Sequence, residues 1–302
     1  MREIVLVTGG LGFIGSRLCL ALLDAGFRVR CVDDLSGTYA PAATGPAAAA
    51  ALTARGADVR IAPVAPTDVR GVDAVIHLAA VPGVRTRRPA AVLHDTNVDL
   101  PARLARAAAA GGTRFVFVSS SSVYGNAPVL PTPERTPPSP LNPYAASKVA
   151  AEAAVLGAAR DPVIVRPFTV YGPGQRPEMA FARWIAALDS GEPLAWRAAP
   201  GTARDFTYVD DAVAGLVAAL TRGRSGEAYN VSGGRSVPLR TALDLLRPGA
   251  ELRELPPSPA EAIVTAGCRR KARAELGYSP RVALADGLAR QLAVATAPSL
   301  AA

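Results

Sequence analysis

Short, continuous apolar runs are the most regular feature of the first half of the chain. The first run covers residues 3–8 (EIVLVT) and leads directly into a glycine-rich segment. A run this short, with no polar alternation, is typical of a strand buried on both faces of a parallel sheet. Similar runs predict four more strands, over residues 28–32, 74–78, 114–119 and 162–166.

Segments with helical spacing separate these runs. They predict helices over residues 16–23, 100–110 and 143–159, and the alanine run 47–51 also favours a helix. Strands that alternate with helices imply right-handed crossover connections. The predicted fold class is therefore α/β, with a Rossmann-type doubly wound parallel sheet over residues 1–165.

The pattern changes after Pro167. The segments become shorter, and glycine- and proline-rich loops cover residues 172–177, 198–201 and 256–259. Helical spacing returns over residues 179–190, 209–221 and 285–294. We expect residues 166–302 to form a smaller C-terminal substrate-binding lobe, with some segments returning to the first domain.

Three glycines open the first predicted helix directly after the first strand. Gly9 permits a tight turn, Gly12 lets backbone amides approach a pyrophosphate, and Gly15 lets helix and strand pack closely. Asp33 follows the second strand, where a carboxylate binds the adenosine ribose hydroxyls and repels a 2′-phosphate. This pattern favours NAD over NADP. The expected loop-side cofactor residues are Gly9, Gly12, Phe13, Ile14, Gly15 and Asp33.

Tyr144 and Lys148 lie four residues apart on a predicted helix, so both side chains share one face. A neighbouring ammonium lowers the pKa of a phenol by stabilising the phenolate. Such a tyrosine can take a proton from a hydroxyl near neutral pH. The third member is expected from the four serines 119–122, which follow a buried strand at the sheet edge where ligands bind.

The scarcity of lysine in the composition draws attention to Lys148. The chain has 33 basic residues, of which only Lys148 and Lys271 are lysines. A lysine is a compact point donor, which arginine is not. The net charge of +8 is scattered along the chain, and its tightest clusters, 85–88 and 269–273, lack interleaved aromatic residues. We therefore expect mostly solvated surface and some contact with a phosphorylated small molecule, and no nucleic acid.

Few residues are available for metal chemistry. Two histidines and three cysteines argue against a zinc ribbon, an iron–sulfur site or a multi-histidine centre, so no metal is expected. The wide spacing of the cysteines indicates reduced thiols and a cytoplasmic location. No charge-free apolar run is long enough to predict a membrane span.

Taken together, the motifs carry a family resemblance. They are TGGLGFIG at 8–15, HLAA at 77–80, SSSSVYG at 119–125, the Tyr144/Lys148 pair, RPF at 166–168 and RDFTYV at 204–209. The chain resembles an extended short-chain dehydrogenase/reductase of the NAD-dependent nucleotide-sugar epimerase/dehydratase family over essentially its whole length. The resemblance implies a homodimer formed through the helix near 100–110 and the helix that carries Tyr144.

The resemblance also assigns roles to residues. Ser120 is implied as the catalytic hydroxyl beside Tyr144 and Lys148, and Arg204 as a ligand of the substrate diphosphate. His77 is implied to be a loop residue near the cofactor and not a base. The further residues implied to line the NAD site are Leu78, Ala79, Ala80, Asn97, Tyr144, Lys148 and Pro167.

The family shares an opening step, in which Tyr144 would remove the proton of the sugar 4-hydroxyl while carbon 4 gives a hydride to NAD. Dehydratases usually carry an acidic pair before the VYG sequence, and uronate decarboxylases carry a glutamate there. This chain has Ser121 and Ser122 instead. Without that acid, elimination lacks its general acid/base. The simplest remaining outcome is rotation of the 4-keto intermediate and hydride return, which is epimerisation.

The segment 166–179 most resembles UDP-glucuronate 4-epimerases, with Thr169 where UDP-glucose epimerases usually have asparagine. Residues 83–85 fit the same subgroup. Neutral hydrogen bonds from Ser121, Ser122 and Thr169 are expected to hold the uronate carboxylate. The expected substrate-binding residues are Arg85, Ser121, Ser122, Thr169, Gln175, Arg176 and Arg204.

Two departures from the family pattern keep other interpretations open. Residues 62–66 lack an acid that often contacts adenine, and residues 257–261 replace a late Arg-x-Gly-Asp element. The nucleotide base and the sugar therefore stay open. The alternatives are a nucleotide-sugar dehydratase, a 4-epimerase of a neutral hexose, or an NAD-binding regulatory protein.

Overall fold

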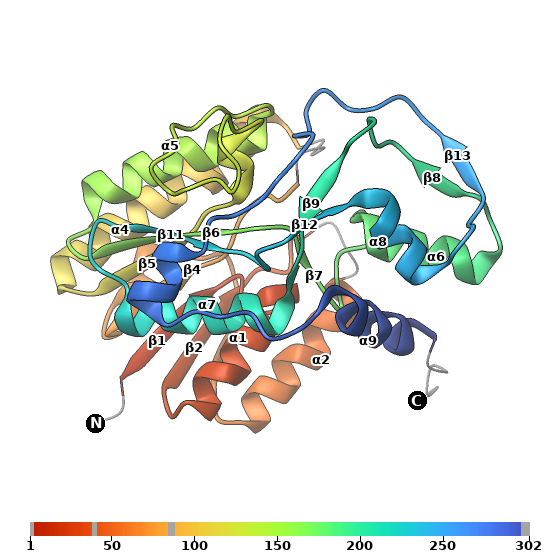
Figure 1. Ribbon diagram of the computed structural model, residues 1–302. Coiled ribbons are helices and arrows are strands. Elements are labelled where there is room, and N and C mark those ends of the chain that lie inside the picture. Colours follow the sequence, from red (N-terminus) through yellow and green to blue (C-terminus); the bar gives the residue numbers. More distant parts are fainter. Residues whose placement is uncertain (1–2, 38–40, 84–87, 297–302) are drawn as a thin grey trace.

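The centre of the molecule is a seven-stranded parallel sheet in the order β11-β6-β5-β4-β1-β2-β3. The computed structural model describes residues 3–37, 41–83 and 88–296 (Figure 1). The strands are β1 (Ile4–Thr8), β2 (Arg28–Asp33), β3 (Asp58–Ile61), β4 (Ala74–His77), β5 (Arg114–Val118), β6 (Pro162–Pro167) and β11 (Ala228–Val231). The predicted doubly wound sheet is confirmed.

Both faces of the sheet are buried, as the unbroken apolar runs require. Val5 and Val7 of β1 point into one core cluster, and Leu6 points into the other. Helices cover both faces. The first cluster includes residues of α1 (Phe13–Asp24), α2 (Pro41–Ala54) and α7 (Val209–Arg222), and the second includes α4 (Leu100–Gly111) and α5 (Pro143–Ala158).

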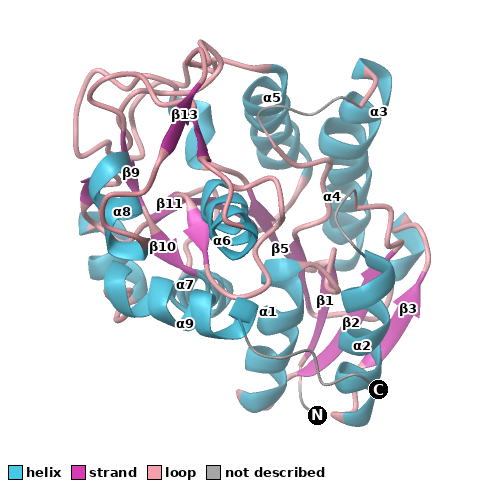
Figure 2. Ribbon diagram, turned by 90° about the vertical axis from the view of Figure 1, so that its right-hand side faces the viewer, coloured by secondary structure: helices cyan, strands magenta, loops and turns pink. Residues whose placement is uncertain are grey.

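A smaller lobe follows β6. Figure 2 shows α6, α8 and β13 grouped on one side of the molecule, with β1, β2 and β3 on the other. Its short strands pair as β10-β7, β12-β9 and β13-β8. The elements are β7 (Val170–Tyr171), α6 (Ala180–Ser190), β8 (Leu194–Trp196), β9 (Ala203–Asp205), β10 (Thr207–Tyr208), β12 (Ser236–Pro238), α8 (Leu239–Leu246), β13 (Leu252–Glu254) and α9 (Leu284–Thr296).

An aromatic cluster forms the core of this lobe. Tyr171 packs edge-on against Phe181 and Phe206, and Trp184 stacks on Trp196 at 5.9 Å between ring centroids. The chain then returns twice to the sheet, because α7 packs on α1 and β11 adds a strand beside β6.

Short helical turns complete the structure. They are the 3-10 turns η1 (Pro66–Val69) and η3 (Ser121–Tyr124), the helix α3 (Ala90–His94) with the π-turn η2 (Asp95–Asp99), and the π-turn η4 (Ala272–Leu276). The predicted strands and helices are all present, with ends that shift by a few residues. The short strands β3 and β11 were not predicted, because neither has a clear apolar run in the sequence. His77 was expected in a loop, but it is the last residue of β4.

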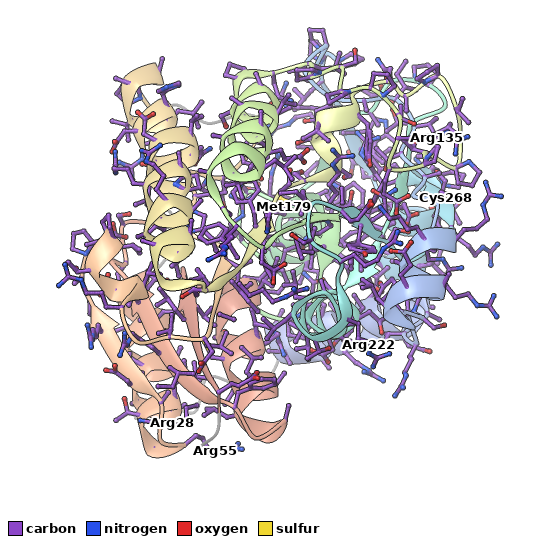
Figure 3. The ribbon with its side chains drawn as sticks, turned by 90° about the vertical axis from the view of Figure 1, so that its left-hand side faces the viewer. Arg28, Arg55, Arg135, Met179, Arg222 and Cys268 are labelled. Atoms are coloured by element: carbon purple, nitrogen blue, oxygen red, sulfur yellow. The ribbon has the colours of Figure 1, made fainter. Side chains whose placement is uncertain are left out.

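The surface carries the scattered arginines that the sequence predicted. Arg28, Arg55, Arg135 and Arg222 are exposed, and Figure 3 shows Arg28 and Arg55 near one end of the molecule, with Arg135 and Arg222 away from them. Among the described helices, none is both long and apolar enough to cross a bilayer. The described residues also bring together no group of three or more potential metal ligands. The cytoplasmic location stays a prediction.

Candidate active site

A large cavity opens at the carboxyl edge of the central sheet. Its volume is about 1290 Å³, and its wall runs from the glycine loop after β1, past the serines after β5, to the second lobe. This is larger than a typical pocket for one small ligand. The strand order reverses between β1 and β4, and ligands bind at such a crevice in doubly wound sheets.

The glycine loop leaves no space for side chains. Gly9 has φ +69°, and a Cβ there would lie 2.8 Å from the backbone nitrogen of Ala79. A Cβ on Gly15 would lie 2.1 Å from the carbonyl oxygen of Gly9. Gly12 precedes α1, and no described side chain caps that helix. The first amides of α1 are therefore available to an anion, such as a pyrophosphate.

Asp33 stands at the end of β2 beside this loop. Its Oδ2 accepts a hydrogen bond from Leu11 N at 3.0 Å, and its Oδ1 accepts one from Leu35 N at 2.9 Å. Burial raises the pKa of Asp33, and these two amides oppose the rise. The carboxylate orients both the glycine loop and the turn after β2, which is where an adenosine ribose would lie.

The loop after β4 forms the other side of the cofactor crevice. Leu78 and Ala80 line the cavity, and Ala79 instead donates its amide to Thr8 Oγ1 at 3.3 Å. Asn97 lies behind this loop and does not line the cavity. Its Oδ1 accepts from Val81 N at 2.8 Å, and its Nδ2 donates to Val81 O at 3.0 Å. Asn97 therefore shapes the wall of the crevice from behind.

His77 is buried at the end of β4. Its Nδ1 lies 2.7 Å from Thr8 Oγ1, and its ring stacks on Phe117. Burial, with a smaller effect of the Lys148 charge, lowers the pKa of His77 to about 3. The ring is therefore neutral and part of the core.

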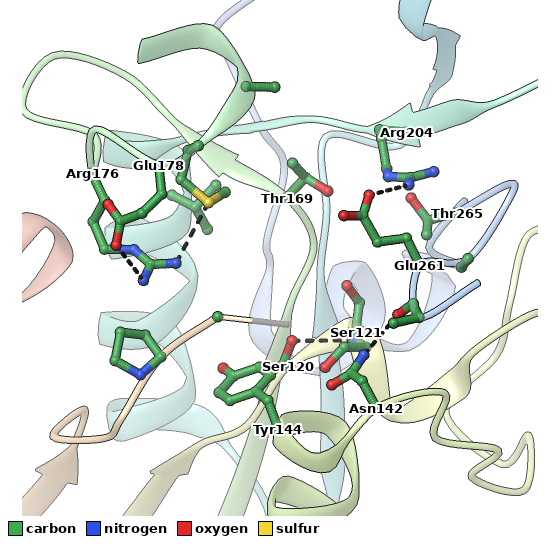
Figure 4. Close-up of a pocket in the computed structure, with 18 of the residues that line it drawn as sticks. Ser120, Ser121, Asn142, Tyr144, Thr169, Arg176, Glu178, Arg204, Glu261 and Thr265 are labelled. Carbon is green, nitrogen blue, oxygen red and sulfur yellow. Dashed lines mark hydrogen bonds and ion pairs between the residues drawn. The ribbon is translucent and has the colours of Figure 1, made fainter. Parts of the chain in front are cut away.

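Ser120, Tyr144 and Lys148 all line the cavity, and Figure 4 shows Ser120 and Tyr144 next to each other. Asn142 caps α5 by accepting a hydrogen bond from Ala145 N at 2.9 Å, so the helix presents Tyr144 in its first turn. The Ser120 hydroxyl is close enough to that of Tyr144 to lower the pKa of the phenol. Lys148 is buried and donates from Nζ to Val118 O at 3.0 Å.

The electrostatics of this trio differ from the sequence-based expectation. The pKa of Tyr144 is raised, because burial outweighs the charge of Arg176 and the hydrogen bond of Ser120. The expected lowering by Lys148 is therefore wrong for the protein alone. Burial lowers the pKa of Lys148 itself to about 8, and the charge of Glu152 opposes this. Pro167, at the end of β6, also lines the cavity.

Neutral hydroxyls line the cavity next to Tyr144. Ser121, Ser122 and Thr169 all contribute to its wall, and Figure 4 shows Ser121 and Thr169 facing the space above Ser120. The Oγ of Ser122 is buried and has no hydrogen-bond partner among the described residues. A buried hydroxyl without a partner is costly, so this atom is suited to a ligand.

Two arginines lie on opposite sides of the cavity (Figure 4). Arg176 Nη1 lies 3.7 Å from Glu178, and Arg204 Nη2 lies 3.5 Å from Glu261. Arg204 also donates to the carbonyl of Ile263 at 3.0 Å. Burial lowers the pKa of Arg204, and Glu261 opposes this. Both guanidinium groups are positioned for an anionic ligand.

Two other expected substrate residues have different surroundings. Gln175 borders the cavity, but its Nε2 donates to Val170 O at 3.1 Å and its Oε1 accepts from Gln291 at 3.0 Å. It therefore anchors its loop to α9. Arg85 lies outside the described residues.

Sequence reasoning missed several residues around the cavity. Glu261 replaces the late family element and pairs with Arg204. Trp196 is one of two tryptophans, and it lines the second-lobe end of the cavity. Glu152 is buried four residues after Lys148, and this helical spacing was the available signal.

Comparison with known proteins places this site in a family. The sequence profile of the NAD dependent epimerase/dehydratase family matches residues 5–232. The chain belongs to that family. Its members are NAD-dependent enzymes, and the glycine loop and Asp33 fit that cofactor. The family resemblance seen in the sequence is confirmed.

Relatives of this family member carry different activities. A dTDP-glucose 4,6-dehydratase of Streptomyces niveus is 33% identical, over 94% of this chain and 90% of its own. A UDP-glucose 4-epimerase of Mycolicibacterium smegmatis is 33% identical, over 94% and 96%. The structure of a UDP-glucuronic acid 4-epimerase from Bacillus cereus, in complex with UDP-glucuronic acid and NAD, has a TM-score of 0.89 and 32% identity. It covers 97% of this chain and 99% of its own. These relatives all act on nucleotide sugars, but the reaction that they catalyse differs between them.

The packing of the glycine loop predicts a strong effect of one methyl group. We expect Gly15→Ala to weaken NAD binding at least about tenfold, or about 1.4 kcal/mol, because the Cβ would collide with the backbone of Gly9. Isothermal titration calorimetry with NAD measures this. Gly157→Ala is the control, since nothing lies within 4 Å of its Cβ in α5. Equal NAD affinities for the two variants would contradict the assignment of the loop.

Proposed function

We propose that this protein is a nucleotide-sugar 4-epimerase that interconverts UDP-glucuronate and UDP-galacturonate. The observation that carries the proposal is the set of neutral hydroxyls beside Tyr144, namely Ser121, Ser122 and Thr169. The similarity to a UDP-glucuronic acid 4-epimerase structure supports it. Among the described residues, two carboxylates also line the cavity, Glu178 and Glu261, but each is paired with an arginine.

The glycine loop and Asp33 would hold the cofactor, with its pyrophosphate at the start of α1. Bound there, NAD would supply reversible hydride transfer at carbon 4 of the sugar. The rest of the reaction is a proton transfer by the protein. Tyr144 Oη takes the proton of the sugar 4-hydroxyl and returns it after the sugar has turned, so the overall reaction is redox-neutral.

Tyr144 needs help to act as a base, because burial raises its pKa. Ser120 donates a hydrogen bond that stabilises the phenolate, and the Arg176 guanidinium acts in the same direction. The Lys148 ammonium lies 5.9 Å from the centre of the Tyr144 ring and adds a positive charge to the same site. A substrate that excludes water strengthens each of these interactions.

The second lobe would hold the nucleotide. Arg204 is positioned to bind the diphosphate and would exchange its contact with Glu261 for phosphate oxygens. Trp196 lines the same end of the cavity and is held by stacking on Trp184, so its ring offers a rigid surface to a base. A nucleotide diphosphate sugar would thus extend from the second lobe to Tyr144.

The hydroxyls explain how a uronate could react without losing carbon dioxide. A 4-keto uronate is a β-keto acid, and its decarboxylation requires a particular orientation of the carboxylate. Hydrogen bonds from Ser122 and Thr169 would restrain that orientation, and neutral donors do not repel the carboxylate. The buried Ser122 Oγ gains a partner in this complex.

Product analysis tests the reaction directly. Incubation of the NAD-loaded protein with UDP-glucuronate is expected to yield UDP-galacturonate, detected by chromatography and NMR. Tyr144→Phe should reduce kcat by roughly 10²–10⁴-fold, because the general base is lost. A 4-keto-6-deoxy product from UDP- or dTDP-glucose would instead identify a dehydratase. Conversion of UDP-glucose alone would identify a neutral-hexose epimerase.

A charge at position 122 tests the carboxylate pocket. Ser122→Glu should raise the KM for UDP-glucuronate by roughly tenfold or more, because two carboxylates would then face each other. Ser122→Gln has the same bulk without the charge and serves as the control. If UDP-glucuronate binds equally well to the Glu and Gln variants, the carboxylate does not lie at this serine.

We also propose that two copies associate through α4 and α5, as the sequence resemblance implied. These helices pack side by side. The outward face of α5 carries the exposed alanines Ala146, Ala150 and Ala153, followed by Leu156, which is 42% exposed. Small side chains permit close approach of helices, and an exposed leucine beside them adds apolar area.

A single arginine tests this interface. Ala150→Arg should shift the protein from dimer to monomer in light scattering after size-exclusion chromatography, because a long charged side chain blocks helix contact. Leu245→Arg introduces the same side chain at an exposed position of α8 and should leave the mass unchanged. A monomeric unaltered protein would refute the proposal.

A further inference from the structure

A buried ion pair lies directly behind the catalytic trio. Glu152 is one helical turn after Lys148 on α5 and is 5% exposed. Its Oε1 accepts hydrogen bonds from Ser119 Oγ at 2.5 Å and from Arg166 Nε at 2.9 Å. Its Oε2 accepts from Arg166 Nη2 at 2.6 Å. The pair is therefore bidentate, and a third residue is bound to the carboxylate.

The arginine of this pair is tied to other elements. Arg166 Nη1 donates to the hydroxyl of Tyr124 at 2.7 Å and to the carbonyl of Glu134 at 3.0 Å. The Tyr124 hydroxyl in turn donates to Asn230 Oδ1 at 2.8 Å. One continuous network thus joins α5, the residue after β5, β6, η3 and β11. Networks that are satisfied in this way hold a buried region in one arrangement.

The network reaches the catalytic groups at two points. Lys148 Nζ is bound to the carbonyl of Val118, and the next residue, Ser119, is bound to Glu152. Ser120 follows immediately. Glu152 lies on the same helix as Lys148 and binds Ser119, which directly follows Val118. It therefore ties this helix to the end of β5 that the lysine contacts.

We propose that Glu152 is a positioning residue of the reaction, which acts with Arg166 and Ser119 to fix the Lys148 ammonium and the Ser120 hydroxyl against Tyr144. The proposal rests on the proposed function only in that Lys148 and Tyr144 do the chemistry. It does not depend on which sugar is the substrate.

The charges around Lys148 indicate how to test this. On its own helix the lysine faces Glu152 and Tyr144. From β4 it faces His77, which is neutral, and from β6 it faces Arg166 beyond Glu152. Arg176 acts on Tyr144 from the second lobe. Glu152 and Arg166 form a buried ion pair next to the trio, so removal of either partner leaves the charge of the other buried there without its counter-ion.

The two single variants are therefore expected to act in opposite directions. Glu152→Gln leaves the buried positive charge of Arg166, which lowers the pKa values of both Lys148 and Tyr144. Arg166→Met leaves the negative charge of Glu152, which raises both values. The pH profile of kcat/KM should shift to lower pH in the first variant and to higher pH in the second, each by roughly one pH unit.

A residue with a merely structural role would not give this result. If both variants lose activity with an unchanged pH profile, or shift it in the same direction, Glu152 does not set the electrostatics of the trio and the proposal is wrong. Spectrophotometric titration of the Tyr144 phenol, against a Tyr144→Phe background, provides the same comparison without turnover. Its apparent pKa should fall in Glu152→Gln and rise in Arg166→Met.

Two further variants keep the proposal testable if a single charge change prevents folding. Ser119→Ala removes one neutral hydrogen bond, and we expect a several-fold lower kcat with unchanged KM and pH profile. An unchanged kcat would show that the Ser119–Glu152 hydrogen bond does not position the catalytic groups, and would refute that part of the proposal. The double variant Glu152→Gln/Arg166→Met removes both charges, so its pH profile should return close to that of the unaltered protein. A profile that stays displaced would contradict the charge argument.

Failure of this proposal is distinguishable from failure of the proposed function. If the unaltered protein does not convert UDP-glucuronate but converts another nucleotide sugar, the substrate assignment fails, and the same pH profiles are measured with that sugar. If UDP-glucuronate is converted and the profiles of the variants do not move, only the role of Glu152 fails.

Discussion

The parallel direction of all seven strands is the constraint on which the site depends. Parallel strands end at one edge of the sheet, so residues distant in sequence are brought to the same place. Gly9 after β1, Leu78 after β4, Ser120 after β5 and Pro167 at the end of β6 all line one cavity. The crossover helices then add groups from their first turns. Asn142 fixes the start of α5, which sets the position of Tyr144 at this edge.

Burial of charge shapes the chemistry of this edge. The buried charge of Glu152 is paired with Arg166, and the partly buried Glu261 is paired with Arg204. Lys148 is different, because its described hydrogen bond goes to a neutral carbonyl, and burial brings its pKa to about 8. A charged group without a close counter-ion is costly in a dry site. Such a group can act on a nearby phenolate or ribose hydroxyl, which a paired lysine does less well.

Much of the fold and the centre of the site could be predicted from the sequence, because their signals are local. Unbroken apolar runs report strands buried on both faces, and the glycine loop and the Tyr144/Lys148 spacing each fit within a few residues. The strand β11 has only four residues and joins the sheet beside β6, far away in sequence, so its pattern alone did not identify it. The role of Gln175 was hidden for a similar reason, since its partner Gln291 lies on the last helix.

The pKa of Tyr144 could not be predicted from spacing either. The sequence showed a neighbouring ammonium, which lowers the pKa of a phenol, but it could not show how deeply the hydroxyl is buried. In the structure burial has the larger effect, and the charge that opposes it comes from Arg176 in the second lobe. The electrostatic surroundings of Tyr144 therefore depend on the second lobe as well as on the sheet.

The groups that line the cavity also bear on the choice between epimerisation and elimination. Elimination needs a carboxylic acid that can deliver a proton to a leaving hydroxyl. Among the described residues, the carboxylates that line the cavity are those of Glu178 and Glu261, and each contacts an arginine. Serine and threonine hydroxyls next to Tyr144 can orient a substrate, but they cannot supply that proton. Under the proposed function, the 4-keto intermediate would therefore turn within the cavity before the hydride returns to carbon 4.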